Sequence, residues 1–226
     1  MWIKICGMTT PEAVVAALEA RVDAIGFVFA ESVRQVSPEV AAQLAASARG
    51  RIRCVAVTRH PRQQDVEEIL KVFKPDVLQT DAADLPLLRL PAQLELLPVL
   101  RGVRDESGDL PSRLLFEGPA SGAGVPCDWT AARNVARRTE LVLAGGLNPG
   151  NVAAAIVDVE PFGVDVSSGV EARPGVKSPV EIANFVSAVR DARPGSAGRS
   201  KLNLAVSQSG ATAEQSRSGV REKPCA

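Results

Sequence analysis

The sequence predicts one closed (β/α)8 barrel, the α/β fold known as a TIM barrel. First, short apolar segments that indicate strands alternate with amphipathic segments that indicate helices, and we count eight such strands in 226 residues. Regular alternation indicates parallel strands, and eight units at this length favour closure into a barrel. Second, a doubly wound open sheet usually has a glycine-rich dinucleotide fingerprint after its first strand, and the turn at 6–9 lacks one.

The third observation concerns two segments near the end of the series, 141–152 and 162–171. Each starts as a short apolar strand, breaks at small residues and then resembles the start of a helix. Small residues let the backbone approach a ligand closely, and the N-terminus of a helix attracts anions. Tandem segments of this kind are where a (β/α)8 barrel usually holds a phosphate group.

The first half of the chain supplies four strands. The run 24–29 is almost wholly apolar, which is typical of a strand covered on both faces. The first helix has a start signal, because Thr9 is followed by Pro11 and, at capping-box spacing, by Glu12. The predicted strands are 2–6, 24–29, 53–58 and 77–79, and the predicted helices are 11–21, 37–48 and 63–73, with a weaker Leu-rich helical stretch from 84.

The second half continues the alternation as far as about residue 192. The strand at 97–102 contains Pro98, which is unusual inside a strand. The other strands are 113–116, 141–144 and 162–166, with helices at 129–138, from 149 and from 178. The composition then changes, because 196–226 is rich in Ser, Gly, Ala, Arg and Gln and cannot bury enough apolar surface to offset its chain entropy. We therefore expect a barrel domain over 1–192 and a low-complexity, disordered tail over 193–226.

Charge and cysteine content limit the location and partners of the protein. Lys plus Arg equals Asp plus Glu, at 26 each, so no net field favours nucleic acid or an acidic membrane. The N-terminus enters a strand without a signal-peptide pattern, and no apolar run is long enough to span a bilayer. Four scattered cysteines without close pairs indicate free thiols. We expect a cytoplasmic monomer that binds a small molecule.

The candidate site residues follow from the rule that these barrels work at the C-terminal ends of their strands. Cys6 ends the first strand and is either a buried apolar residue or a reactive thiolate. Lys4, two residues earlier on the same strand face, could favour the thiolate or serve as a structural ion-pair partner. The rule selects Cys6, Arg34, Gln79, Arg101, the loop 117–129, Gly145 to Asn148, and Asp165 to Gly169.

Arg34 and Asp128 have two interpretations each, and His60 has one. Arg34 is either solvated or a planar fork for bidentate carboxylate recognition. Asp128 is either a helix N-cap or, beside Trp129, a desolvated acid. His60, the only histidine, is interpreted as a solvated loop residue, because no nucleophile elbow accompanies it. No His, Asp or Glu spacing suggests a metal site, so neither a metal nor a cofactor is predicted.

Four motifs together resemble a known family. They are Lys4-Ile-Cys-Gly7 with Thr9, Gly26-Phe-Val-Phe29 with Ser32 and Arg34, Leu143-Ala-Gly-Gly-Leu-Asn-Pro149 with Asn151 and Val152, and Gly163-Val-Asp-Val-Ser-Ser-Gly-Val-Glu171 with Pro174, Gly175 and Lys177. In these motifs the chain resembles phosphoribosylanthranilate isomerase of tryptophan biosynthesis, over roughly residues 2–192. The resemblance implies a cytoplasmic (β/α)8 enzyme without a cofactor, which performs the Amadori rearrangement of N-(5-phosphoribosyl)anthranilate.

The resemblance also implies roles for the site residues. Cys6 matches the general base, Asp128 the general acid, and Arg34 the arginine that binds the anthranilate carboxylate. Asp165 resembles a ribose-side or supporting residue, and Gln79 is counted with the substrate-binding residues. Phosphate binding matches Gly145, Gly146, Ser167, Ser168 and Gly169. The chain departs from the family pattern after the fourth strand, at Leu78-Gln-Thr-Asp81, at Glu117, and in the sixth loop, at Ser121-Gly-Ala-Gly124 and Cys127.

The predicted mechanism is a pair of proton transfers. Asp128 protonates the furanose ring oxygen, and the Cys6 thiolate then removes the proton from ribose carbon 2. This requires a neutral carboxylic acid and an ionised thiol together, the inverse of their ordinary pKa order. Two alternatives stay open: another phosphosugar isomerase or epimerase barrel, and a non-catalytic protein that binds a phosphate ligand.

Overall fold

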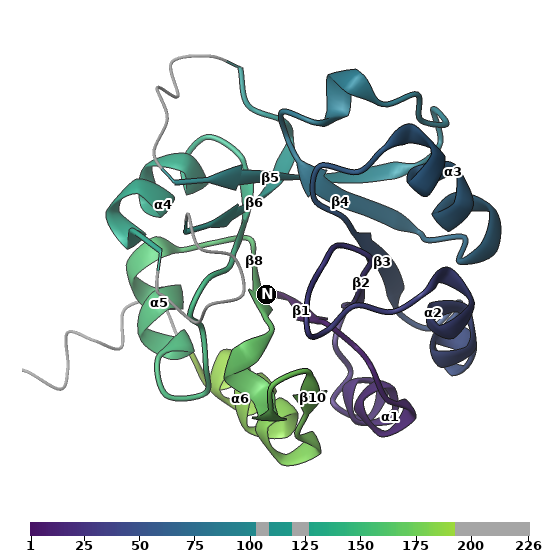
Figure 1. The fold of residues 1–226 in the computed structure, drawn as a ribbon. Coiled ribbons are helices and arrows are strands. Elements are labelled where there is room, and N and C mark those ends of the chain that lie inside the picture. Colours follow the sequence, from purple (N-terminus) through teal and green to yellow (C-terminus); the bar gives the residue numbers. More distant parts are fainter. Residues whose placement is uncertain (103–108, 119–126, 193–226) are drawn as a thin grey trace, which may run out of the picture. The chain divides into compact units, whose positions relative to one another are not determined.

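The computed structural model contains a closed barrel of parallel strands in the order β1 to β8, which confirms the predicted fold class (Figure 1). The structure describes residues 1–102, 109–118 and 127–192. The last strand pairs with the first through the register Lys4↔Asp165. The strands are β1 Trp2–Cys6, β2 Ala24–Val28, β3 Arg53–Val57, β4 Val77–Asp81, β5 Glu95–Arg101, β6 Arg113–Glu117, β7 Glu140–Leu143 and β8 Gly163–Val166.

Helices surround the barrel, and their starts follow the local sequence. Pro11, Pro38 and Pro179 occupy first-turn positions, where the missing N–H has no intrahelical partner in any case. The helices are α1 Pro11–Glu19, α2 Pro38–Leu44, α3 Gln63–Val72, α4 Trp129–Ala136, α5 Val152–Val159 and α6 Pro179–Asp191, with 3-10 turns η1 Ala45–Ser47, η2 Leu85–Leu87 and η3 Ser168–Val170. A small hairpin, β9 Glu171–Arg173 and β10 Val176–Lys177, precedes α6.

Some local predictions were wrong in detail. The N-cap of α1 is Thr10, whose hydroxyl accepts from the Ala13 N–H, whereas Thr9 donates to the carbonyl of Gly175. The Leu-rich stretch from 84 forms only the short turn η2. Pro98 does lie inside β5, where the pairing with β4 continues on both sides of it. The missing proline N–H therefore interrupts the ladder at one position only.

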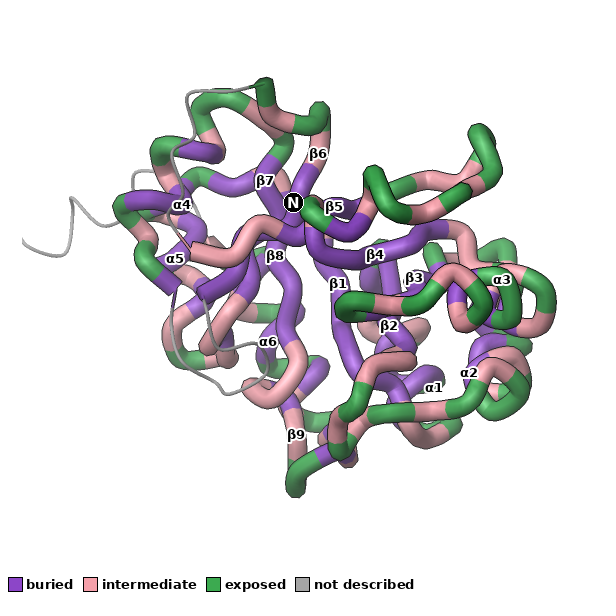
Figure 2. Tube along the Cα trace, turned by 45° about the horizontal axis from the view of Figure 1, so that its top comes forward, coloured by how far each residue is buried: buried purple, intermediate pink, exposed green. Residues whose placement is uncertain are grey.

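The core has two layers, and Figure 2 shows the strands as mainly buried segments between more exposed loops. Phe27, Phe73, Phe116 and Phe185 are fully buried in the larger layer, which includes strand and helix residues. A smaller cluster includes Ala24, Val55, Val77, Leu97, Val99, Leu115, Val142 and Ala144. Among the described residues, no helix has both the length and the apolar character needed to cross a membrane.

Candidate active site

A cavity unites most of the predicted site residues at the C-terminal ends of the strands. The ends of β1, β4 and β8 contribute Cys6, Gln79 and Asp165, and the loop after β2 contributes Arg34. Parallel strands end on the same side of a barrel, so residues far apart in sequence meet there. The predicted residues that line this cavity are Cys6, Arg34, Gln79, Arg101, Glu117, Gly145, Gly146, Leu147, Asp165, Val166, Ser167 and Ser168, whereas Asn148 and Gly169 are not part of the lining.

Lys4 and Asp165 form a buried ion pair beneath Cys6. The Lys4 Nζ lies 2.8 Å from Asp165 Oδ1, and the Lys4 side chain has no exposed surface. Burial opposes the charged lysine, but the nearby Asp165 and Cys6 outweigh it and raise the pKa of Lys4. A Cβ at Gly26 would lie 3.0 Å from the Cys6 Sγ and 3.2 Å from the Lys4 Nζ. Lys4 is therefore both an ion-pair partner and a cation beside the thiol.

The pKa of Cys6 is shifted in the direction opposite to the one that the predicted mechanism requires. Burial raises the pKa of the Cys6 thiol, and the attraction of Lys4 and Lys177 for a thiolate only partly offsets this effect. The expectation of a depressed thiol pKa is therefore not met, because Cys6 is almost wholly buried and the nearby Asp165 also raises its pKa. Cys6, Cys54 and Cys127 are free thiols, as predicted; Cys225 lies outside the described residues.

Arg34 contacts a carboxylate of its own chain. Its Nε lies 2.6 Å from Glu171 Oε1 and its Nη2 lies 3.0 Å from Glu171 Oε2, which is the bidentate geometry of a guanidinium and a carboxylate. Lys177 Nζ lies 2.7 Å from the same Oε1 and also donates to the carbonyl and the hydroxyl of Ser167. Sequence reasoning assigned no role to Glu171 or Lys177, because nothing local indicates that a residue 137 positions away contacts Arg34.

The two predicted phosphate segments lie against each other. Gly145 and Gly146 have φ values of +90° and +66°, which L side chains rarely adopt. A Cβ on Gly169 would lie 2.0 Å from the Leu147 carbonyl oxygen, so the second segment touches the first through backbone. After β8 the second segment forms only the 3-10 turn η3, and the helix predicted from 178 follows the hairpin as α6, with Ser178 as its N-cap.

Gly169→Ala is expected to weaken binding of inorganic phosphate by about tenfold or more, because the methyl group would push the two segments apart and displace their N–H groups by roughly 1 Å. A phosphate titration followed by NMR measures the effect. Gly150→Ala is the matched control, since the nearest atom to its Cβ is a flexible side-chain oxygen of Asn148 at 3.2 Å. Equal affinities of both variants and the wild type would contradict this location for the phosphate.

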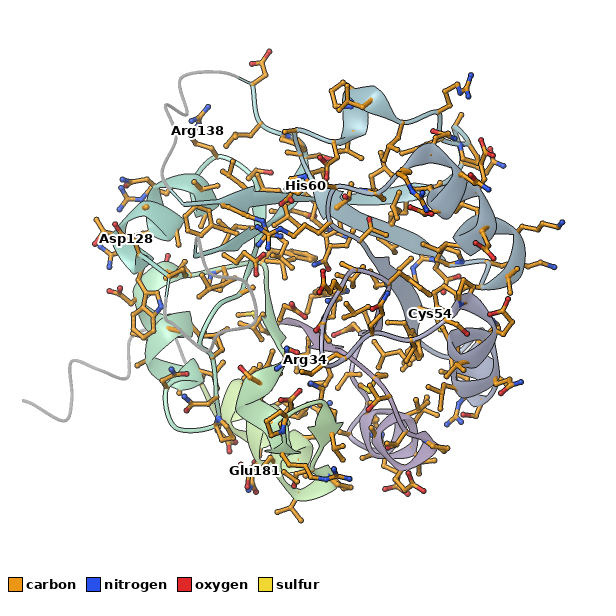
Figure 3. All side chains as sticks on the ribbon, viewed as in Figure 1. Arg34, Cys54, His60, Asp128, Arg138 and Glu181 are labelled. Carbon is orange, nitrogen blue, oxygen red and sulfur yellow. The ribbon has the colours of Figure 1, made fainter. Side chains whose placement is uncertain are left out.

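Asp128 is not among the residues that line the cavity. It is the N-cap of α4, and its Oδ1 accepts from the N–H groups of Thr130 and Ala131 at 2.9 and 3.2 Å. Its side chain is exposed and is drawn beside α4, well away from Arg34 (Figure 3). The N-cap interpretation is thus confirmed, and a role as an acid stays a prediction. Most of the sixth loop, 119–126, lies outside the described residues.

Asp81 and Glu117, two residues at which the chain departs from the family pattern, both bind the same arginine side chain. Arg101, at the end of β5, places its Nε 2.5 Å from Asp81 Oδ1 and bonds to Glu117 Oε1 through Nη1. The buried Oε1 of Gln79, on the same side of the cavity, accepts no hydrogen bond from a described residue, so it is available to a ligand donor. The sequence selected Arg101 by position but gave no sign of its partners.

His60 is a solvated loop residue, as the sequence indicated, with 66% of its side chain exposed, and it also contacts two aspartates. Its backbone N–H donates to Asp84 Oδ2 at 3.0 Å and its Nδ1 lies 2.9 Å from Asp84 Oδ1. Its Nε2 lies 3.7 Å from Asp81 Oδ2. In the described part of the chain these three side chains form the group whose donor atoms converge as metal ligands do, within 4.8 Å. Asp81 Oδ1 is paired with Arg101, and Asp84 with His60, whereas the buried Asp81 Oδ2 has no hydrogen-bond partner among the described residues.

Comparisons with known proteins agree with one another. Residues 3–188 match the family model of N-(5'-phosphoribosyl)anthranilate isomerase. The N-(5'-phosphoribosyl)anthranilate isomerase of Rhizobium rhizogenes is 38% identical over 210 residues, covering 84% of this chain and 94% of the relative. The enzyme of that name from Thermus thermophilus is 26% identical, with a TM-score of 0.74 over 85% of this chain and 100% of the other.

A further solved structure of a phosphoribosyl anthranilate isomerase holds a ligand. It is a complex with reduced 1-(o-carboxyphenylamino)-1-deoxyribulose 5-phosphate, and it is 26% identical to this chain. The two structures superpose with a TM-score of 0.69, over 84% of this chain and 98% of the other.

Proposed function

The chain belongs to the N-(5'-phosphoribosyl)anthranilate isomerase family, and on this premise we propose how its residues carry out that isomerisation in tryptophan biosynthesis. The reaction is the Amadori rearrangement of N-(5'-phosphoribosyl)anthranilate to 1-(2-carboxyphenylamino)-1-deoxyribulose 5-phosphate. The observation that carries the proposal is the convergence of Cys6, Arg34 and the two phosphate segments on one cavity. Cys6 would take the proton that the reaction removes, Arg34 would bind the carboxylate of the substrate, and the two segments would bind its phosphate.

Binding at both ends of the substrate orients its reactive centre. The backbone around Gly145, Gly146 and Ser167 to Gly169 holds the phosphate, and Arg34 holds the anthranilate carboxylate. Gln79 and Asp165 face the ribose between them, since both line the cavity and Gln79 has an available acceptor. Binding energy from these remote groups positions carbon 2 of the ribose near Cys6.

The chemistry consists of proton transfers. The Asp128 carboxyl gives its proton to the ring oxygen, the bond from that oxygen to carbon 1 breaks, and a protonated Schiff base forms. The Cys6 thiolate takes the proton of carbon 2, and the electron pair of that C–H bond moves toward the nitrogen to give an enolamine. The enolamine then loses its hydroxyl proton and gains one at carbon 1, which yields the ketone. A thiol with a raised pKa ionises less often, but its thiolate is a stronger base.

We further propose that the protein acts as a monomer in the cytoplasm, without a cofactor, nucleic acid or membrane partner. The mechanism above moves only protons and therefore needs no redox or metal group. The even charge balance supports the absence of a polyanionic partner. The large exposed apolar side chains of the described residues are distributed over several elements, which supports the monomer. They are Met1, Val15, Val33, Val40, Leu87, Leu96 and Val180.

The test follows the loss of fluorescence of freshly prepared phosphoribosylanthranilate on adding the protein. We expect rapid loss with the wild type and a rate at least about tenfold lower with Asp128→Asn. This variant separates the two interpretations of Asp128, because asparagine is an equally good N-cap but cannot donate an acidic proton. Unchanged turnover would show that Asp128 only caps α4. Phosphate binding without turnover by the wild type would instead indicate a binding protein or a different phosphosugar enzyme.

A further inference from the structure

We propose that Glu171 is the positioning residue of the Arg34 clamp, and that it thereby determines the preference of the site for a carboxylate-bearing aromatic substrate. The inference rests on the proposed function, in which Arg34 binds that carboxylate. It adds a residue that does not touch the substrate and acts through Arg34.

The geometry of the pair leaves one side of the guanidinium available. Glu171 engages Nε at 2.6 Å and Nη2 at 3.0 Å. A guanidinium carries five N–H groups in one plane, so two are used by Glu171 and three remain on Nη1 and Nη2. Arg34 lines the cavity, and its side chain is only 12% exposed. The bidentate contact therefore fixes the plane of the guanidinium and determines where the remaining N–H groups can point.

Glu171 also separates two cations that would otherwise repel each other. Its Oε1 lies 2.7 Å from Lys177 Nζ, and the Lys177 side chain has no exposed surface. Burial works against a charged Glu171, but the hydrogen bonds from Arg34 and Lys177 outweigh it and lower the pKa of Glu171. The shared carboxylate therefore holds the Arg34 and Lys177 side chains in one hydrogen-bonded network.

The hairpin that carries Glu171 is held against two loops, the one after β1 and the one after β2 that carries Arg34. Thr9 Oγ1 donates to the Gly175 carbonyl at 2.6 Å, and a Cβ on Gly175 would lie 2.6 Å from the Val33 carbonyl oxygen. On the other side, a Cβ on Gly7 would lie 2.6 Å from the Arg34 Cδ and 3.3 Å from the Lys177 Nζ. The Arg34 side chain is thus enclosed between the β1 end and the hairpin, with Glu171 as its carboxylate partner.

Glu171→Gln tests the inference, because it keeps the shape of the side chain and removes its charge. We expect KM for phosphoribosylanthranilate to rise about tenfold and kcat to stay within about threefold of the wild type. Calorimetry then compares two ligands, reduced 1-(o-carboxyphenylamino)-1-deoxyribulose 5-phosphate and its counterpart without the carboxylate. Affinity for the first should fall about tenfold, and affinity for the second should stay within about twofold. Glu171→Asp, which restores the charge, should recover part of the loss.

The control is Asp158→Asn. Asp158 on α5 forms an ion pair with Arg133 on α4, outside the cavity, and the substitution removes the carboxylate of that pair. It should change neither ligand affinity. Circular dichroism verifies that each variant is folded; if Glu171→Gln is not, the same comparison with Glu171→Asp decides. Equal losses for both ligands, or a lower kcat at unchanged KM, would overturn the positioning role. If the wild type converts no substrate, the proposed function is wrong, whereas the two calorimetric affinities still decide the role of Glu171.

Discussion

Cys6→Ala is expected to lower kcat by roughly 100- to 10,000-fold, with KM for phosphoribosylanthranilate within a few-fold of the wild type. The thiol is the proposed base, and alanine removes it while leaving the carboxylate and phosphate contacts in place. Cys6 is only 7% exposed, but alanine lacks just the sulfur atom, so the substitution leaves a small cavity at the strand end. Steady-state kinetics with the fluorescent substrate measure both constants.

The matched control for Cys6 is a second buried thiol outside the cavity. Cys54, on β3, is fully buried and belongs to the larger core layer. Burial raises its pKa to about 11, so it is also an un-ionised thiol at neutral pH. Cys54→Ala should therefore leave kcat unchanged. Turnover by Cys6→Ala close to that of the wild type would exclude Cys6 as the base.

The base assignment also fixes the direction of the pH dependence. Only the thiolate accepts the proton, and burial raises the pKa of Cys6, so the thiolate is the minor form at neutral pH. The kcat/KM ratio should therefore rise with pH by up to about tenfold per unit on this limb, until another group begins to limit the reaction. A profile that is flat from about pH 6 to 9 would show that a different group removes the proton.

Lys4→Met is expected to lower the free energy of unfolding by about 3–5 kcal/mol, because it leaves Asp165 charged and buried without its partner. For a chain of this size the loss corresponds to a decrease of about 6–20 °C in Tm. Thermal unfolding followed by circular dichroism measures it. The exposed pair of Arg62 and Asp65 provides the comparison, since Arg62→Met should change Tm very little.

A double variant tests the cause of this destabilisation. Lys4→Met with Asp165→Leu removes both charges, and it should recover much of the stability although it abolishes activity. In Lys4→Met alone, burial keeps the pKa of Asp165 above its unfolded value, so the penalty should shrink as the pH falls and Asp165 becomes protonated. No recovery in the double variant would show that the loss comes from packing and not from an unpaired charge.

The sequence was sufficient to locate the strand ends, and with them most of the cavity. Cys6, Gln79 and Asp165 each end or nearly end an apolar run, so the alternation of strands and helices placed them at the same end of the barrel. These signals are local, because strand length and helix starts depend on neighbouring residues. Pairings of side chains across the barrel are not local, and the sequence contained no sign of them.

Three contacts illustrate this limit. The bond of Arg34 to Glu171, the sharing of Arg101 between Asp81 and Glu117, and the orientation of His60 by Asp84 each join segments from different parts of the barrel. The first and third depend on how the segments after the strands pack, and the second on the register of three neighbouring strands. The pKa of Cys6 depends on the same packing, which is why the sequence suggested a shift in the wrong direction.

The register between β1 and β8 has a consequence for the order of folding. Lys4 and Asp165 are 161 positions apart, so almost the whole barrel must be synthesised before they can meet. Contacts of such long sequence separation carry a large loop-closure cost and form late. Until then Lys4 can keep its hydration water, because an open sheet does not enclose it. The lysine loses that water and gains its counter-charge in the same event, so a chain that stops before residue 163 has no means of sealing the barrel around it.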